Sequence, residues 1–345
     1  MPIYGYIGLK FNVVFDKHVE KPITSFLDDY FHLVHDNNEE PAFTVELVSD
    51  EYKNTKKIIE RGNELIILNG SMHKFYEKGF SYDDGYVRSV YNSMTKGVYH
   101  INYVTNKVTV YNKDLTMLTR DGKRVIRDLV KVCVEQEKDA ILYHGAVLEG
   151  LDGQGVMLMG DKSSGKTPTS LKMMFDYGFN EVSRDKVFVK KAEGENILFG
   201  WPTHYNLTMR TLRSFESLNR HFPQELSDYS DSELDSIRDK MQLMPSEMGI
   251  SKKSSTAKLS HIVLLTRNKK GLDVWDMFAR NCYSPKDPLY TNWHNWSEDN
   301  SAVVSKAKAL TKELVNHKNI LIVEREENLD NTVKRIVDWV KEAEI

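Results

Sequence analysis

The chain has 345 residues, of which 40% are hydrophobic and 28% are charged, and its net charge is −3 at neutral pH. This composition is typical of a globular protein and excludes a disordered or fibrous one, and the length predicts two domains, or one large domain with an appended module. The slightly negative charge gives no reason to expect nucleic-acid binding. No stretch approaches the roughly 18 apolar residues that a membrane span needs, so we expect no membrane association.

The cysteine content and the first residues point to a compartment. Only Cys133 and Cys282 occur, and neither has the clustered Cys or His neighbours of a zinc site. Few cysteines in a long chain favour a reducing compartment over a disulfide framework. Residues 1–20 lack the basic start, long apolar core and small-residue cleavage site of a secretory signal. We therefore expect a soluble, cytoplasmic protein.

Residues 1–115 are expected to form a β-rich N-terminal domain. Short segments rich in β-branched and aromatic residues recur there, with turn residues between them, so hairpins or a meander are predicted. The expected strands are Ile3–Phe15, Phe43–Val48, Leu65–Leu68, Tyr86–Tyr91, Gly97–Tyr103 and Lys107–Tyr111.

Residues 116–345 are expected to form a second, mixed α/β domain. From Asp121 the apolar residues recur at helical spacing, which predicts an amphipathic helix that ends near Lys138. Two apolar runs, Ala140–Leu148 and Val156–Met159, are typical of buried strands. A helix is expected next over Thr167–Tyr177, with Gly178 as its C-cap.

The rest of the chain continues this pattern. Residues 214–258 are polar and rich in Ser and Asp, which favours an insertion or a lid. The other expected elements are the strands Val187–Val189, Ile197–Phe199, His261–Thr266 and Ile320–Val323 and the amphipathic helix Asn328–Glu342. Strands with a helix directly after a glycine loop fit a mixed α/β nucleotide-binding core.

A phosphate-binding motif provides the main functional signal. Residues 160–167 match G-x-x-x-x-G-K-[ST] without a mismatch, and the whole loop is expected to bind the cofactor: Gly160, Asp161, Lys162, Ser163, Ser164, Gly165, Lys166 and Thr167. The glycines allow close backbone approach, so that N–H groups surround a polyphosphate. Lys166 adds a charge for the β and γ phosphates, and the Thr167 hydroxyl can bind Mg²⁺. We therefore predict that ATP and Mg²⁺ bind here.

The alternative interpretation is a Gly/Ser-rich turn with a solvent-facing Lys166. The pattern is loose, and context decides between the two. An apolar strand leads into the loop and a helical pattern leaves it, as the motif requires. Pro168 fits an early helical position, where its missing N–H costs little.

With its flanks included, this part of the chain resembles the HPr kinase/phosphorylase family. The residues that carry the resemblance are Tyr143–Leu148 before the loop, Gly160–Thr167, Gly178–Val187 and Leu207–Arg210. The resemblance extends over about residues 140–268, and its central part is the most specific. It implies a mixed α/β P-loop core like the C-terminal domain of HPr kinase, also seen in phosphoenolpyruvate carboxykinases, preceded here by the β-rich N-terminal region.

The resemblance also implies an activity and its residues. The family transfers the γ-phosphoryl group of ATP to a serine hydroxyl, and relatives act on peptides or small molecules. His144 would lie near the γ-phosphate, Asp185 would hold Mg²⁺ together with Thr167, and Arg210 is retained. The acceptor would be a peptide, protein or small molecule, and the family often forms oligomers, including hexamers.

Two positions depart from the family pattern. Arg184 replaces the first of two paired aspartates, which is the family's acid/base residue, and Thr208 replaces a metal-associated glutamate. Arg184 could stabilise the transferring charge in cis, as arginine fingers do, or be a surface arginine that replaced the acid. Because phosphoryl transfer depends mainly on positioning and charge neutralisation, the two changes weaken the kinase interpretation without refuting it.

The other candidates also have structural interpretations. His144 could be a hydrogen-bonded histidine beside a buried strand, Asp185 a turn residue that caps N–H groups, and Arg210 part of a salt bridge. Lys252, Lys253 and Lys258 could clamp an acidic acceptor or form a solvated basic face, which we prefer.

Trp293 and Trp296 form a pair of closely spaced aromatics. They could stack on a base or grip a peptide. Aromatics at this spacing are more often core or interface anchors, and we favour that interpretation.

We therefore expect an ATP-dependent kinase with His144, Lys166, Asp185, Arg184 and Arg210 as its catalytic residues. The alternative is a catalytically impaired nucleotide-binding protein that signals through a partner.

Overall fold

The computed structural model describes residues 2–34, 40–70, 76–150, 152–201, 203–243, 245–250, 255–288, 290–296, 299–326 and 328–342. The chain divides into two compact units. The first is Met1–Ala140 with Tyr283–Ala307, and the second is Ile141–Cys282 with Lys308–Ile345. This division differs from the expected boundary after residue 115, because the helix that follows residue 115 packs on the N-terminal sheet. Each unit is described by itself.

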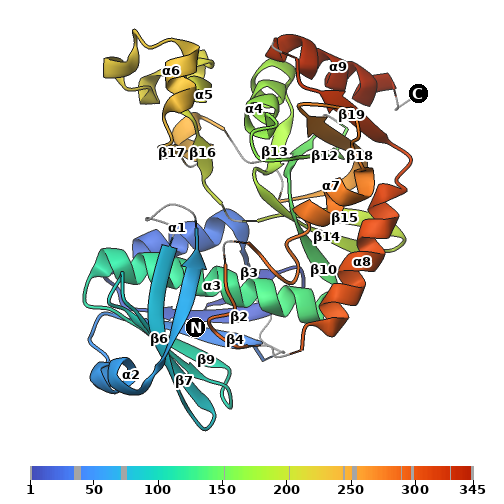
Figure 1. Cartoon of the computed structure of the whole chain (residues 1–345). Coiled ribbons are helices and arrows are strands. Elements are labelled where there is room, and N and C mark those ends of the chain that lie inside the picture. The colour runs from blue at the N-terminus through green and yellow to red at the C-terminus, as the bar shows by residue number, and fades with distance from the viewer. Residues whose placement is uncertain are drawn as a thin grey trace. The chain divides into compact units, whose positions relative to one another are not determined.

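The first unit is built on a nine-stranded sheet (Figure 1). Strand β4 is parallel to β2 and to β9, and the other pairs are antiparallel. In sheet order the strands are β3 (His32–Val34), β1 (Ile3–Tyr6), β2 (Leu9–Phe15), β4 (Phe43–Val48), β9 (Lys107–Tyr111), β8 (Val98–Asn102), β7 (Val87–Asn92), β6 (Tyr76–Asp84) and β5 (Asn63–Asn69).

The expected strand Ile3–Phe15 is in fact the hairpin β1–β2. Ile7 and Gly8 both have positive φ, at 52° and 77°, and turn the chain back on itself. Glycine accepts this conformation at no steric cost, and its neighbour is held there by the turn. The strands expected further along were confirmed within a few residues, whereas β3, β6, α1 (Glu20–Tyr30) and α2 (Thr55–Arg61) were not predicted.

Helix α3 (Leu115–Glu137) lies across one face of this sheet and packs against β2, β4 and β9 (Figure 1). It begins several residues before the expected Asp121 because the carboxylate of Asp114 caps it, accepting bonds from the backbone N–H groups of Thr116 and Met117. Its end near Lys138 was predicted correctly. The expectation missed residues 115–120 because the polar residues 119–124 interrupt the apolar spacing.

The segment 283–307 completes the core of the first unit. Trp293 is 1% exposed, and its indole Nε1 donates to Asp128 Oδ2 of α3 at 2.7 Å. The ring of Trp296 lies near the rings of Phe43 and Tyr103. The core interpretation of the Trp293–Trp296 pair is therefore confirmed.

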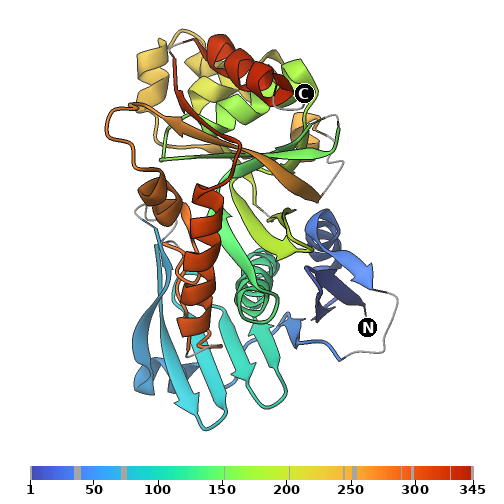
Figure 2. The same cartoon turned by 90° about the vertical axis from the view of Figure 1, so that its right-hand side faces the viewer.

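The second unit contains an eight-stranded sheet of mixed direction (Figure 2). Strand β18 (Thr256–Thr266) is central and is parallel both to β12 and to β19. Along the sheet the order is β10 (Ala140–His144), β14 (Lys186–Ala192), β15 (Glu195–Gly200), β18, β12 (Gln154–Gly160), β11 (Ala146–Glu149) and β13 (Asn180–Ser183), with β19 (Ile320–Glu324) beside β18.

Helices α4 (Lys166–Tyr177) and α9 (Leu329–Glu342) pack together on this sheet (Figures 1 and 2). Both were predicted: Gly178 ends α4 with a φ of 76°, and α9 buries its expected apolar face. The expected strand Ala140–Leu148 is divided at Gly145 into β10 and β11. The backbone N–H of Gly145 donates a hydrogen bond to the carbonyl oxygen of Asp185 at this break. The pairs β14–β15 and β18–β19 lie where strands were expected.

The polar region 214–258 is structured in its described parts. It contains α6 (Asp231–Ser236), two 3-10 helices before it, and β17 (Met241–Leu243), which pairs with β16 (Tyr205–Leu207). Its apolar residues, with those of α5 (Met209–Arg213), share a core with α4 and α9. Helices α7 (Val274–Asn281) and α8 (Ser301–Val315) were not predicted. Within the ranges described above, no helix has the length and apolarity to cross a bilayer.

Candidate functional site

The candidate loop connects the end of a buried strand to the start of a helix. Val156–Met159 of β12 are fully buried beside β18, and α4 begins at Lys166. Gly160 has a φ of 155° and Gly165 a φ of 100°. A Cβ on Gly160 would collide with the Leu265 carbonyl of β18, so only glycine lets the two strands meet there.

Lys166 is folded back over this loop. Its Nζ donates to the carbonyl oxygens of Gly160 at 2.6 Å and Asp161 at 3.2 Å. Burial lowers the pKa of Lys166 to about 8, although the charges of Asp185 and Asp161 oppose this shift. The structure therefore does not place Lys166 as a solvent-facing side chain. Its desolvated ammonium is a group that a bound anion would stabilise.

Two hydroxyls accompany the lysine. Ser164 is 2% exposed, and its Oγ has no hydrogen-bond partner among the described residues. Buried polar atoms are rarely left unpaired, and a ligand oxygen would satisfy this one. Thr167 lies in the first turn of α4, where the N-terminal N–H groups of a helix favour anions.

His144 and Asp185 lie against each other in the same unit. His144 Nε2 lies 3.4 Å from Asp185 Oδ1, and the backbone bond between Gly145 and Asp185 holds the two segments together. Burial by itself raises the pKa of Asp185, but the hydrogen bond and charge of His144, with the charges of Lys186 and Lys166, lower it to about 2. Asp185 is therefore ionised at neutral pH and close enough to act on the loop lysine.

Arg184 is buried away from solvent. Its Nη2 lies 3.0 Å from Glu181 Oε1, and both side chains are almost fully buried. The guanidinium stands 4.9 Å from the ring centroid of Tyr205, whose hydroxyl donates to Glu181 Oε2. This arrangement favours a structural role, and the burial of Arg184 contradicts its interpretation as a surface arginine.

The other two positions lie on helix α5. Thr208 is its N-cap and accepts a bond from the Thr211 backbone N–H. Arg210 is ion-paired with Asp235 at 2.6 Å and Asp231 at 3.4 Å, which is the salt-bridge interpretation. The charge of Arg210 nevertheless lowers the pKa of Arg325, the residue that follows β19, so Arg210 lies within electrostatic reach of that arginine.

Two arginines that the sequence did not single out lie against the loop. Arg267 follows β18, and its Nε donates to the Ser163 carbonyl at 3.2 Å. Arg325 follows β19, and its Cδ would lie 3.0 Å from a Cβ placed on Gly165. Within the part of the chain that the structure describes, neither forms an ion pair. Burial, and then Arg210 and Arg267, lower the pKa of Arg325.

A topological signal could have found both arginines. Each comes directly after the carboxyl end of a strand that is parallel to the loop strand, and ligands of α/β sheets bind at such ends. The strands themselves were predicted, but their direction and neighbours were not.

A hollow of about 400 Å³ opens beside the loop. It is lined on one side by Asp161, Lys162 and Ser164 and on the other by the segment 266–280. Asp161 lies 3.6 Å from Arg280 across it. The hollow, the loop and the His144–Asp185 pair all belong to the second unit.

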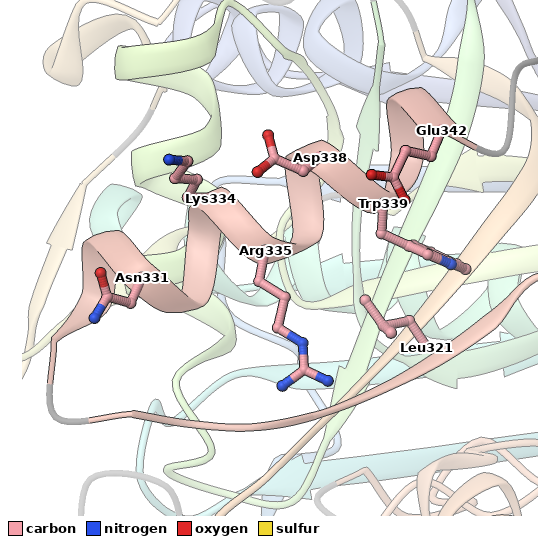
Figure 3. Close-up of a pocket in the computed structure, with 7 residues that line it drawn as sticks. All are labelled: Leu321, Asn331, Lys334, Arg335, Asp338, Trp339 and Glu342. Carbon is pink, nitrogen blue, oxygen red and sulfur yellow. The ribbon is translucent and has the colours of Figure 1, made fainter.

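A second hollow, of about 460 Å³, lies away from these residues (Figure 3). Its lining comes from β19 and the outer face of α9, where Trp339 lies beside Leu321 and charges of both signs surround them. None of the candidate residues lines it, so it adds nothing to the site.

The basic stretch is described only in part. Lys252 and Lys253 lie outside the described residues. Lys258 is in β18 and forms an ion pair with Glu195, as expected of a solvated basic face. Among the described residues, no group of three or more His, Cys, Asp or Glu side chains could hold a metal ion, so a metal here would need hydroxyl, phosphate or water ligands as well.

Comparison with known proteins gives limited information. No family model matches the chain, and no curated protein matches it. Among solved structures, the chain is similar to one described as the structure of the Hpr(Ser) kinase/phosphatase from Coxiella burnetii, at 15% identity and a TM-score of 0.25. The match covers 38% of this chain and 62% of that one, which is less than two thirds of its length. At this level, the similarity carries no argument about function.

Proposed function

We propose that this chain is an ATP-dependent phosphotransferase, which binds MgATP at residues 160–167 and transfers the γ-phosphoryl group to a hydroxyl of a peptide, protein or small molecule. The observation that supports this best is Lys166, a half-buried lysine folded across a loop between a buried strand and a helix N-terminus. Such a desolvated cation at the N-terminus of a helix suits a polyphosphate.

The loop residues divide the binding of the phosphates among them. Lys166 would exchange its two carbonyl partners for β- and γ-phosphate oxygens, and the Ser164 hydroxyl would gain the partner that it lacks. Gly165 has a φ of 100° and Ser163 a φ of 66°, backbone conformations that occur where a loop curls around an anion. The helix α4 adds the positive end of its dipole.

Thr167 and Asp185 would hold Mg²⁺. When bound, this ion neutralises the charge on the phosphates. The fit rests on the chemistry of the donors: a hydroxyl in the first turn of α4 and a carboxylate that stays ionised at neutral pH. Hard oxygen donors of this kind, few in number, suit Mg²⁺, which keeps several water and phosphate ligands.

His144 is the candidate for work on the acceptor. Its Nε2 faces Asp185, which fixes the orientation of the ring, and 18% of its side chain is exposed. In its neutral form, a histidine oriented in this way could take the proton of an acceptor hydroxyl. Arg210 is proposed only to add positive charge, since it is ion-paired with the carboxylates of α6.

A second function, nucleotide binding without efficient transfer, is favoured by one specific observation. The two positions where the family has acids are engaged in the architecture instead: Arg184 neutralises Glu181, and Thr208 caps α5. Neither can supply a carboxylate to the reaction. A protein of this kind would signal nucleotide occupancy to a partner.

Labelled ATP separates the two functions. Purified protein is incubated with γ-labelled ATP, Mg²⁺ and a size-fractionated extract of the source cell, beside Lys166→Ala and the matched control Arg335→Ala, which removes an exposed arginine of α9. We expect label in one fraction with the wild type and Arg335→Ala, and none with Lys166→Ala. Asp185→Asn should abolish transfer while MgATP still binds.

Titration of MgATP completes the test. If MgATP binds and no fraction is labelled, the sensing function replaces the kinase. If the wild type does not bind MgATP, both proposals are wrong.

A further inference from the structure

We infer that the hollow between residues 160–167 and residues 266–280 receives the ribose and base of the nucleotide, so that the triphosphate runs from there toward the His144–Asp185 pair. This inference rests on the proposed function, because it assigns the direction in which a nucleotide lies in the loop. Nothing in the motif itself fixes that direction.

The shape and lining of the hollow are the first observation. Its volume of about 400 Å³ is within the range of small-molecule sites. The loop contributes Ser164, which is buried and whose Oγ has no partner in the described part of the chain. Leu272 supplies a half-buried apolar side chain on the opposite wall. The hollow therefore joins the phosphate loop to a surface that a ribose and base could cover.

The strand order is the second observation. Gly160 at the end of β12 pairs with Leu265 at the end of β18, and the two strands are parallel. The residues after β18 consequently emerge at the same edge of the sheet as the loop. Ligands of such sheets lie outside the carboxyl ends of the strands and contact the loops that follow neighbouring strands.

The arginines are the third observation. Arg267 is an exposed side chain held against the loop by its bond to the Ser163 carbonyl, and it lines the hollow. Arg325 lies over Gly165. Neither has an ion-pair partner in the described ranges, so both guanidinium groups can bind an anion. A planar guanidinium can bond an α-phosphate and can also stack on a base.

The charges around the loop differ between its two ends. Asp185, which lies against His144, is the first acid that acts on Lys166, whereas Arg210 and Arg267 are the first charges that act on Arg325. A carboxylate is expected near the γ-phosphate, where it can bind the metal ion. Neighbouring arginines are expected near the α-phosphate, whose negative charge they can neutralise. This asymmetry gives the nucleotide its direction.

Binding of a nucleotide and of its phosphates alone tests the assignment. Affinities for MgATP and for magnesium tripolyphosphate are measured by calorimetry on the full chain. The variants are Leu272→Trp, which fills the hollow, Arg267→Ala, which removes an exposed guanidinium, and the control Arg335→Ala. Loss of stacking and burial should weaken MgATP binding by about tenfold in the first two variants. Leu272→Trp should leave tripolyphosphate binding within about twofold.

Three results would overturn the inference. The wild type could bind MgATP no more tightly than tripolyphosphate, in which case the nucleoside lies in solvent. Leu272→Trp and Arg267→Ala could both bind MgATP like the wild type, in which case the hollow holds the acceptor or nothing. These two results leave the proposed function intact. If the wild type binds neither ligand, the proposed function fails and the inference fails with it.

Discussion

Replacing Arg184 distinguishes a structural arginine from a catalytic one. Glu181 and Arg184 are 1% and 2% exposed in their side chains, and their closest charged atoms are 3.0 Å apart. Removal of one partner leaves the other charge buried and unpaired, which typically costs about 3–5 kcal/mol. Arg184→Met should therefore lower the free energy of unfolding of the second unit by about that amount, a large part of the stability of an ordinary domain.

The double variant provides the control. Arg184→Met with Glu181→Gln leaves no buried charge, and the amide oxygen at position 181 still accepts from the Tyr205 hydroxyl. We expect it to recover most of the lost stability, with a coupling energy of about 2–3 kcal/mol in the double-mutant cycle. Urea unfolding followed by circular dichroism gives the stabilities, and MgATP titration and labelled transfer give the function. The structural interpretation is wrong if Arg184→Met costs less than about 1 kcal/mol. It is also wrong if the stable double variant loses transfer while it still binds MgATP.

Three further outcomes follow from the geometry. Gly160→Ala should weaken MgATP binding at least tenfold and lower the melting temperature, because a Cβ there meets the Leu265 carbonyl at a φ of 155°; binding as tight as in the wild type would contradict this. Asp114→Ala should lower the free energy of unfolding of the first unit by about 1 kcal/mol in urea, since it removes the cap of α3, while leaving MgATP binding unchanged. Burial, followed by the charges of Lys131 and Arg88, lowers the pKa of His294 to about 3 in the folded protein. Between about pH 6.5 and 3 the unfolded chain therefore binds one proton more at this residue than the folded chain does, and the free energy of unfolding falls as the pH is lowered through that range. The slope of the free energy of unfolding against pH should be smaller in His294→Gln than in the wild type by about 1.4 kcal/mol for each pH unit. Equal slopes in the two proteins would exclude His294 as the cause.

The elements that were predicted from the sequence are those whose signals are local. Helix α9 has an apolar face at a strict helical spacing, and α4 lies between a glycine loop and a glycine C-cap with a φ of 76°. The strand that leads into the loop, β12, contains the continuous apolar run Val156–Met159. Helix α1 was missed although Ile23, Phe26 and Leu27 recur at helical spacing, because no side chain caps its start and β-rich segments lie on both sides of it. Helix α8 was missed because its many lysines and serines obscure its apolar face.

The candidate site could be predicted only in its local part. Residues 160–167 and the pair His144 and Asp185 were named from the sequence, and the structure brings the pair within 3.4 Å. The environment of Arg184 could not be foreseen, because its partner Tyr205 belongs to a later strand and the burial of Glu181 depends on that contact. Arg267 and Arg325 were missed for a similar reason: only the parallel pairing of β12, β18 and β19 places them at the loop.

The first unit consists of two separate stretches of the chain, and this affects how it can fold during synthesis. Asp128 and Trp293, which share a buried hydrogen bond, are 165 residues apart in the sequence. During synthesis the indole is added long after the carboxylate has left the ribosome, and residues 141–282 of the other unit emerge in the interval. Residues 308–345 of the other unit come later still, so neither unit can be completed until most of the chain has been made. Until Trp293 arrives, the nascent chain holds an unfilled core and an unpaired acid, a state that invites chaperone binding and aggregation.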